Sequence, residues 1–168
     1  MIPLVPAHLT CEYRADPRGI DALRPRLSWQ VQSPQRGQRQ SAYRILVADS
    51  PRRLAAGEGN VWDSGKVLSG RTVTVRYGGP ALASGRCCFW KVRVWDKNGQ
   101  PSPDSAPAQW QMGLLRPSDW RASWISAATP RDTKDDGLVL PPCPYLRKTF
   151  TLAKPIKQAT LYATARGL

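Results

Sequence analysis

The sequence predicts an all-β fold, a sandwich of seven short antiparallel strands. About seven segments, spread over roughly 105 residues, alternate apolar and polar side chains with the period of two that a half-buried strand requires. Turn-forming residues separate these segments roughly every ten residues, as in a β-sandwich. In addition, 16 prolines and 13 glycines are distributed along the 168 residues, which argues against long helices.

The first three strands are expected before residue 51. Residues 9–14 ("LTCEYR") alternate weakly and lead into a loop marked by Asp-Pro, Gly and Pro. Residues 26–33 ("RLSWQVQS") place leucine, tryptophan and valine on one face and polar side chains on the other. Residues 41–50 ("SAYRILVADS") are rich in β-branched and aromatic side chains, which favours a strand over a helix.

One helical turn is expected next, in residues 50–59 ("SPRRLAAGEG"). Ser50 is a capping residue, Pro51 occupies the first helical position, and Gly57 ends the turn.

Four further strands complete the sandwich. The segments are residues 61–67 ("VWDSGKV"), which could be a short strand or a turn around Gly65, and residues 71–77 ("RTVTVRY"), 87–95 ("CCFWKVRVW") and 106–113 ("APAQWQMG"). The aromatic side chains expected to fill much of the core are Trp29, Tyr43, Trp90 and Trp110.

The segment 87–95 has the clearest two-faced pattern. Its expected core face carries Cys88, Trp90, Val92 and Val94, and its other face carries Phe89, Lys91, Arg93 and Trp95. Trp95, Arg93 and Lys91 are therefore the candidate surface residues. They could stack on a sugar ring. They could instead pack against cross-strand neighbours such as Arg71 or Arg76, or lie under a following domain, and we favour this interpretation.

The formal net charge of +13 invites a nucleic-acid interpretation, but the arginines are scattered and no run exceeds the pair Arg52-Arg53. We therefore expect a solvated basic surface and no specific nucleic-acid partner. Non-specific adhesion, which added salt would remove, is the weaker alternative.

No catalytic, metal or cofactor site is expected. Glu12 and Glu58 are the only glutamates, and the aspartates occur mostly in turns, where their side chains bond the local backbone. The four cysteines show no C-x-x-C spacing and the chain has one histidine, His8, which we expect to be exposed ahead of the first strand. Glycine-rich loops of the phosphate-binding type are absent.

The opening "MIPLVPAHLT" lacks the basic segment and long apolar run of a signal peptide, and no stretch approaches the length of a membrane span. These features predict a cytoplasmic location, no membrane partner and reduced thiols. Cys87 and Cys88 point to opposite faces of their strand, so any disulfide would join distant parts of the sequence.

The character of the chain changes after the sandwich. We expect a sandwich domain in residues 8–113, a linker rich in turn formers in residues 114–144, and two strands, 145–152 ("YLRKTFTL") and 156–165 ("IKQATLYATA"), in residues 145–168. Two strands cannot bury a core of their own. They would either pack on the sandwich or be the first strands of an incomplete second β-sandwich.

The segments "VWDSGK", "CCFWKVRVWDKNGQPS", "DWRASWI" and "YLRKTFTL" occur in an order and at intervals that resemble the N-terminal region of bacterial α-L-rhamnosidases, the inverting glycoside hydrolases. The resemblance runs from residue 9 to residue 168. It implies a fibronectin type III or immunoglobulin-like sandwich followed by a second β-sandwich, with the catalytic domain and its carboxylates further on and absent here.

The resemblance therefore implies a non-catalytic module, inactive alone, that supports the downstream domains of the same enzyme. The alternative function is a carbohydrate-binding module for rhamnose-containing glycans.

Overall fold

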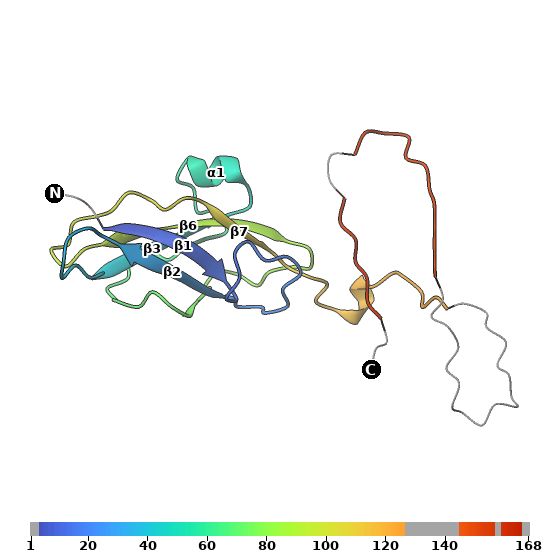
Figure 1. The fold of residues 1–168 in the computed structure, drawn as a ribbon, viewed down its shortest axis with the longest axis horizontal. Coiled ribbons are helices and arrows are strands. Elements are labelled where there is room, and N and C mark those ends of the chain that lie inside the picture. Colours follow the sequence, from blue (N-terminus) through green and yellow to red (C-terminus); the bar gives the residue numbers. More distant parts are fainter. Residues whose placement is uncertain (1–3, 127–144, 157–158, 166–168) are drawn as a thin grey trace, which may run out of the picture. The chain divides into compact units, whose positions relative to one another are not determined.

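Seven strands, one short α-helix and one 3-10 turn form the regular structure of the chain (Figure 1). The computed structural model describes residues 4–126, 145–156 and 159–165. The chain divides into two compact units, Met1–Arg121 and Ala122–Leu168, and every regular element lies in the first unit.

The strands form two antiparallel sheets. The strands are β1 (Val5–Cys11), β2 (Arg26–Gln32), β3 (Ala42–Ala48), β4 (Trp62–Asp63), β5 (Val75–Arg76), β6 (Cys87–Trp95) and β7 (Ala108–Gln111). One sheet has the order β1-β2-β5 and the other has the order β4-β3-β6-β7. The predicted all-β sandwich of seven strands is confirmed.

The core lies between the two sheets and is built around the four aromatic side chains predicted for it. Trp29, Tyr43, Trp90 and Trp110 all belong to one buried cluster. Their rings meet edge to face: the ring centroids of Trp29 and Tyr43 are 5.2 Å apart and those of Trp90 and Trp110 are 6.5 Å apart. Such geometry matches the quadrupoles of aromatic rings and fixes the packing of the two sheets.

Strand β1 begins and ends earlier than the sequence predicted, because residues 12–14 are not in a strand. Glu12 and Tyr13 have φ angles of 47° and 63°, in the left-handed region, and they turn the chain after Cys11. At the other end, Pro6 is tolerated because β1 is an edge strand that pairs only with β2. His8 is exposed as expected, but the prediction that it precedes the first strand is wrong, because it lies inside β1 at an irregularity between Ala7 and Thr10.

Strand β5 is shorter than the segment 71–77 predicted for it. The Trp29 amide donates to the carbonyl of Thr72, and the Thr74 amide donates to the hydroxyl of Ser28. Because Thr74 also has a φ angle of 53°, the regular ladder with β2 includes only Val75 and Arg76.

Helix α1 (Pro51–Ala55) covers part of the outer face of the four-stranded sheet (Figure 1). As predicted, Ser50 is its N-cap and accepts a hydrogen bond from the Arg53 amide, and Pro51 begins it. Leu54 on α1 packs with Leu46 and Ala48 of β3 and with Phe89 of β6. The outer faces of β3 and β6 are therefore buried at this end, although the alternating sequence indicates only one core face for each.

The two strands predicted in the tail are not present in the described residues. Residues 145–156 and 159–165 carry no strand assignment. A strand forms only when its backbone groups bond a neighbouring strand, and the described part of the second unit provides none. Residues 127–144, most of the predicted linker, lie outside the described residues.

Candidate functional surface

The candidate residues Lys91, Arg93 and Trp95 project from β6 on the outer side of the four-stranded sheet. Cys88, Trp90, Val92 and Val94 point inward and are fully buried, so the predicted division of β6 into two faces is confirmed. The three candidates lie beyond the part of this face that α1 covers, and each is partly exposed.

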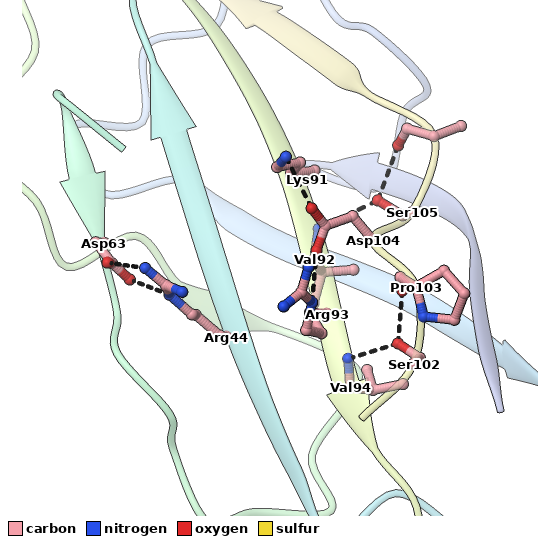
Figure 2. Close-up of polar contacts among 11 residues, drawn as sticks. Arg44, Asp63, Lys91, Val92, Arg93, Val94, Ser102, Pro103, Asp104 and Ser105 are labelled. Carbon is pink, nitrogen blue, oxygen red and sulfur yellow. Dashed lines mark hydrogen bonds and ion pairs between the residues drawn. The ribbon is translucent and has the colours of Figure 1, made fainter. Parts of the chain in front are cut away.

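Lys91 and Arg93 are both held by one carboxylate, that of Asp104 (Figure 2). The Lys91 Nζ atom lies 2.8 Å from Asp104 Oδ2, and the Arg93 Nε atom lies 2.8 Å from Asp104 Oδ1. Burial by itself would raise the pKa of the Asp104 carboxyl group. The hydrogen bond from Lys91 and the charges of Lys91 and Arg93 outweigh burial, so this pKa lies below its ordinary value.

A second ion pair draws apart two arginines that are neighbours on adjacent strands. Arg44 of β3 is directly opposite Arg93 of β6, an arrangement of like charges that is unfavourable unless each charge has a partner. Arg44 donates from Nε and Nη2 to the two oxygens of Asp63, at 2.9 and 2.6 Å (Figure 2). Each arginine is therefore drawn toward its own carboxylate, Arg44 to Asp63 and Arg93 to Asp104.

Asp104 is positioned by two serines, Ser102 and Ser105, on either side of it (Figure 2). Both serines bond the backbone of β6 along the part of its edge that pairs with no regular strand. The Ser102 amide donates to the Val94 carbonyl, and the Val94 amide donates to Ser102 Oγ at 3.0 Å. Ser105 repeats the pattern with Val92, whose amide donates to Ser105 Oγ at 3.1 Å. The serine hydroxyls thus replace backbone carbonyls as acceptors, and Asp104, between them, lies over β6.

Trp95 pairs with a different cation from those that the sequence suggested. Lys66 Nζ lies 4.7 Å from the centroid of the Trp95 ring, a cation–π contact. The proposed neighbours Arg71 and Arg76 do not fill this role: Arg76 belongs to the other sheet, where it pairs with Arg26. Local sequence does not identify Lys66 as the partner, because Lys66 follows a turn at Gly65, and only the fold places the segment after this turn beside β3.

A small hollow of about 90 Å³ opens at the centre of this surface. It is lined by Arg44, Leu46, Gly57, Lys91, Arg93 and Asp104. Typical small-molecule sites measure about 300–1,000 Å³. The hollow is therefore too small to enclose a sugar ring. Of the cations that line it, Lys91 and Arg93 pair with Asp104, and Arg44 pairs with Asp63 outside the lining.

The carboxyl groups of the described residues can be compared with the requirements of a glycosidase. An inverting enzyme needs two carboxyl groups about 6.5–9.5 Å apart, one of them kept protonated by a raised pKa. The six carboxyl groups whose pKa shifts all have a pKa below the ordinary value: Glu12, Asp49, Asp63, Asp96, Asp104 and Asp119. None of them is suited to serve as the general acid.

Among the residues that the structure describes, no three His, Cys, Asp or Glu side chains come together as a metal site. In the same residues, no helix has both the length and the apolar composition to span a membrane.

Two features of this surface were not predicted from the sequence: the aspartates that bind its cations, and the segment 101–107. Asp63 belongs to a turn sequence, Asp63-Ser64-Gly65, and nothing in the sequence indicates that Asp63 or Asp104 binds cations on neighbouring strands. The segment 101–107 does hold a usable signal. It contains three prolines, which cannot donate backbone hydrogen bonds, alternating with serines that can accept them.

The fold and this surface together define an immunoglobulin-like β-sandwich domain in which Lys91, Arg93 and Arg44 are paired with carboxylates on one outer sheet face. Comparison with known families gives the assignment: the model of the Rha78A-like N-terminal immunoglobulin domain matches residues 6–116. The chain belongs to this family.

Known α-L-rhamnosidases are similar to the chain in sequence. It is 50% identical over 119 residues to an α-L-rhamnosidase of Streptomyces avermitilis, covering 71% of this chain and 11% of that protein. It is 36% identical over 165 residues to one of Formosa agariphila, covering 96% of this chain and 18% of that protein. The chain therefore spans less than a fifth of the length of these relatives.

Solved structures agree with the sequence comparison. The Streptomyces avermitilis α-L-rhamnosidase complexed with L-rhamnose superposes with a TM-score of 0.71 at 47% identity, over 74% of this chain and 12% of that one. The α-L-rhamnosidase from Dictyoglumus thermophilum gives a TM-score of 0.70 at 37% identity, over 73% and 14% of the two chains. In both cases the match covers a small part of a much larger enzyme.

Proposed function

We propose that this chain is a non-catalytic structural module of an α-L-rhamnosidase. The parent enzyme would hydrolyse terminal α-L-rhamnosides with inversion, and this sandwich would support its downstream domains. The observation that carries the proposal is the paired state of the outer surface: Lys91, Arg93 and Arg44 bind Asp104 and Asp63 rather than pointing into an open site. Such a surface stabilises the sheet and leaves no reactive group available.

A structural role also agrees with the way the first unit ends. Ser84 donates to Asp119 and accepts a hydrogen bond from the Leu115 amide, and the Arg116 amide donates to Asp119. The segment that leaves β7 is therefore fastened to the loop before β6. These hydrogen bonds fix the position at which the chain leaves the sandwich.

Incubation of the purified chain with an aryl α-L-rhamnoside tests the non-catalytic assignment. We expect no release of the aryl group above the buffer blank. Hydrolysis that co-purifies with the chain, and that persists when the chain is prepared from a host without rhamnosidase activity, would not come from a contaminating host enzyme. That result would overturn the proposal.

The alternative function, binding of rhamnose-containing glycans at Trp95, Arg93 and Lys91, stays a prediction. Trp95 is partly exposed, which sugar stacking requires, but its ring already contacts Lys66. Calorimetric titration of the folded chain with such glycans at millimolar concentration decides between the two functions. Heat of binding that disappears in Trp95→Ala, and persists in a control such as Tyr13→Ala, would favour the glycan function.

A further inference from the structure

Two buried thiols face the core from opposite sheets. Cys11 is the last residue of β1 in the three-stranded sheet, and Cys88 is the second residue of β6 in the four-stranded sheet. Their side chains are 1% and 0% exposed, and both belong to the same buried cluster. Both are free thiols in the structure.

The two strands that carry these thiols approach each other across the core. Residues of β1 and β6 approach within 8 Å, measured between Cα atoms, and disulfides typically join residues whose Cα atoms are about 4.4–6.8 Å apart. Cys88 is also near enough for its charge to contribute, after burial and Glu12, to the raised pKa of the Cys11 thiol. Because β1 is an edge strand with an irregularity between Ala7 and Thr10, it can adjust to close a bond without disturbing β3 and β6.

The other thiol on β6, that of Cys87, cannot replace Cys88. Cys87 precedes it on β6 and therefore points to the opposite face, where it is only partly buried. Cys87 is available to reagents in solution, whereas Cys11 and Cys88 share the interior.

We propose that Cys11 and Cys88 form a disulfide that links the two sheets when the domain folds in the presence of a low-molecular-weight disulfide such as oxidised glutathione. One cysteine thiolate attacks the glutathione disulfide, forming a mixed disulfide and releasing one glutathione thiolate. The second cysteine thiolate then attacks the protein sulfur of the mixed disulfide and releases the other glutathione. Two protein thiols are oxidised and one glutathione disulfide is reduced.

The disulfide forms during folding rather than in the native domain. Burial raises the pKa of the Cys11 thiol to about 12 and that of the Cys88 thiol to about 11, so few thiolates exist in the native state near pH 7. Oxidation of the native domain is therefore slow, and oxidation during refolding is fast. Where glutathione is kept reduced, the two thiols stay free.

The linkage is identified by peptide mapping. The reduced chain is unfolded in urea, refolded by dilution into oxidised and reduced glutathione, alkylated with iodoacetamide and digested with trypsin without reduction. Cleavage after Arg14, Arg86 and Lys91 gives peptides 1–14 and 87–91, which contain Cys11 and the pair Cys87-Cys88. We expect a species that joins these two peptides, with the alkyl group or glutathione on Cys87.

Two variants separate this bond from others. Cys87→Ser is expected to keep the linked species, and Cys88→Ala is expected to lose it. The oxidised wild-type domain should unfold at a temperature about 10 °C or more above that of the reduced domain, because a loop of roughly 75 residues is closed in its unfolded state. Dithiothreitol should remove this increase.

Alkylation of both Cys11 and Cys88 in wild-type protein refolded with oxidised glutathione would overturn the proposal. Loss of the linked species in Cys87→Ser would do so equally, since it would assign the bond to Cys87. Both results are independent of rhamnosidase activity, so they leave the proposed function untouched.

Discussion

At the scale of single residues, Asp104 determines whether the outer face of β6 is stable. Its carboxylate is the shared partner of Lys91, whose side chain is 12% exposed, and of Arg93. Removing one partner of a poorly solvated ion pair leaves the other charge without compensation. The free energy of unfolding should therefore depend on the ionisation of this one carboxyl group.

Asp104→Asn should lower the free energy of unfolding by about 1 kcal/mol at pH 6. The pKa of Asp104 in the folded domain lies below its ordinary value of 3.8. Its contribution is therefore complete above that value and is lost as the pH falls through the lower, folded-state pKa. Urea unfolding at several pH values should show the wild type and the variant converging as the pH falls below 3.8 and through the lower, folded-state pKa.

Asp21→Asn is the matched control, because Asp21 is exposed and makes no ion pair among the described residues. It should change the unfolding free energy little at any of these pH values. A difference between wild type and Asp104→Asn that stays constant down to pH ~2 would show that the ion pairs are not its source.

Ser102→Ala should destabilise the domain by about 1–3 kcal/mol, because it leaves the buried Val94 amide without an acceptor. Ser33→Ala is the control, since Ser33 bonds the Gln35 amide in an exposed turn. Thermal unfolding measures both. Equal, small effects of the two substitutions would mean that the serine hydroxyls do not replace backbone acceptors along β6.

At the scale of elements, α1 contributes through one side chain. Leu54 is 2% exposed and closes the small cluster formed by Leu46, Ala48 and Phe89. Leu54→Ala should lower the free energy of unfolding by about 2–3 kcal/mol, since it leaves a cavity under the helix. Leu68→Ala, at a side chain that is 82% exposed, should change it by less than about 0.5 kcal/mol. Denaturant unfolding that gives the two variants equal midpoints would contradict this role for α1.

Local pattern predicted the elements that depend on neighbours in sequence. The alternation in β2, β3 and β6 and the Ser-Pro start of α1 were sufficient to place them, and the four core aromatics followed from that alternation. The ends of the strands were harder to predict from the sequence. The positive φ angles at Glu12, Tyr13 and Thr74 end or interrupt β1 and β5 through contacts with β2, and no local preference of glutamate, tyrosine or threonine indicates them.

The sequence predicts which face of β6 carries the candidate side chains, but not which residues these side chains contact. Alternation alone placed Lys91, Arg93 and Trp95 on the outer side of β6. Their partners come from other parts of the sequence: Asp104 from the connection to β7, and Lys66 from the segment after β4. Such pairings are long-range, so a single sequence does not reveal them.

At the scale of the whole molecule, the sandwich protects the edge of its larger sheet. The Gln109 amide donates to Asp16, and the Gln111 amide donates to the carbonyl of Pro17. Ile20 then forms a parallel bridge with Met112. The loop before β2 thus covers the free edge of β7, the edge that does not pair with β6. Without this loop, β7 would present unpaired backbone groups to other strands.

The most direct test of the structural role exchanges the domain between enzymes. Residues 6–116 of this chain replace the matching region of the Streptomyces avermitilis α-L-rhamnosidase, and a variant that lacks this region serves as the comparison. We expect the deletion to unfold at a lower temperature. We expect the chimera to recover that loss and to keep kcat/KM for an aryl α-L-rhamnoside within about threefold, less than 1 kcal/mol in activation free energy. A deletion variant as stable as the intact enzyme, or a chimera no more stable than the deletion, would contradict the account.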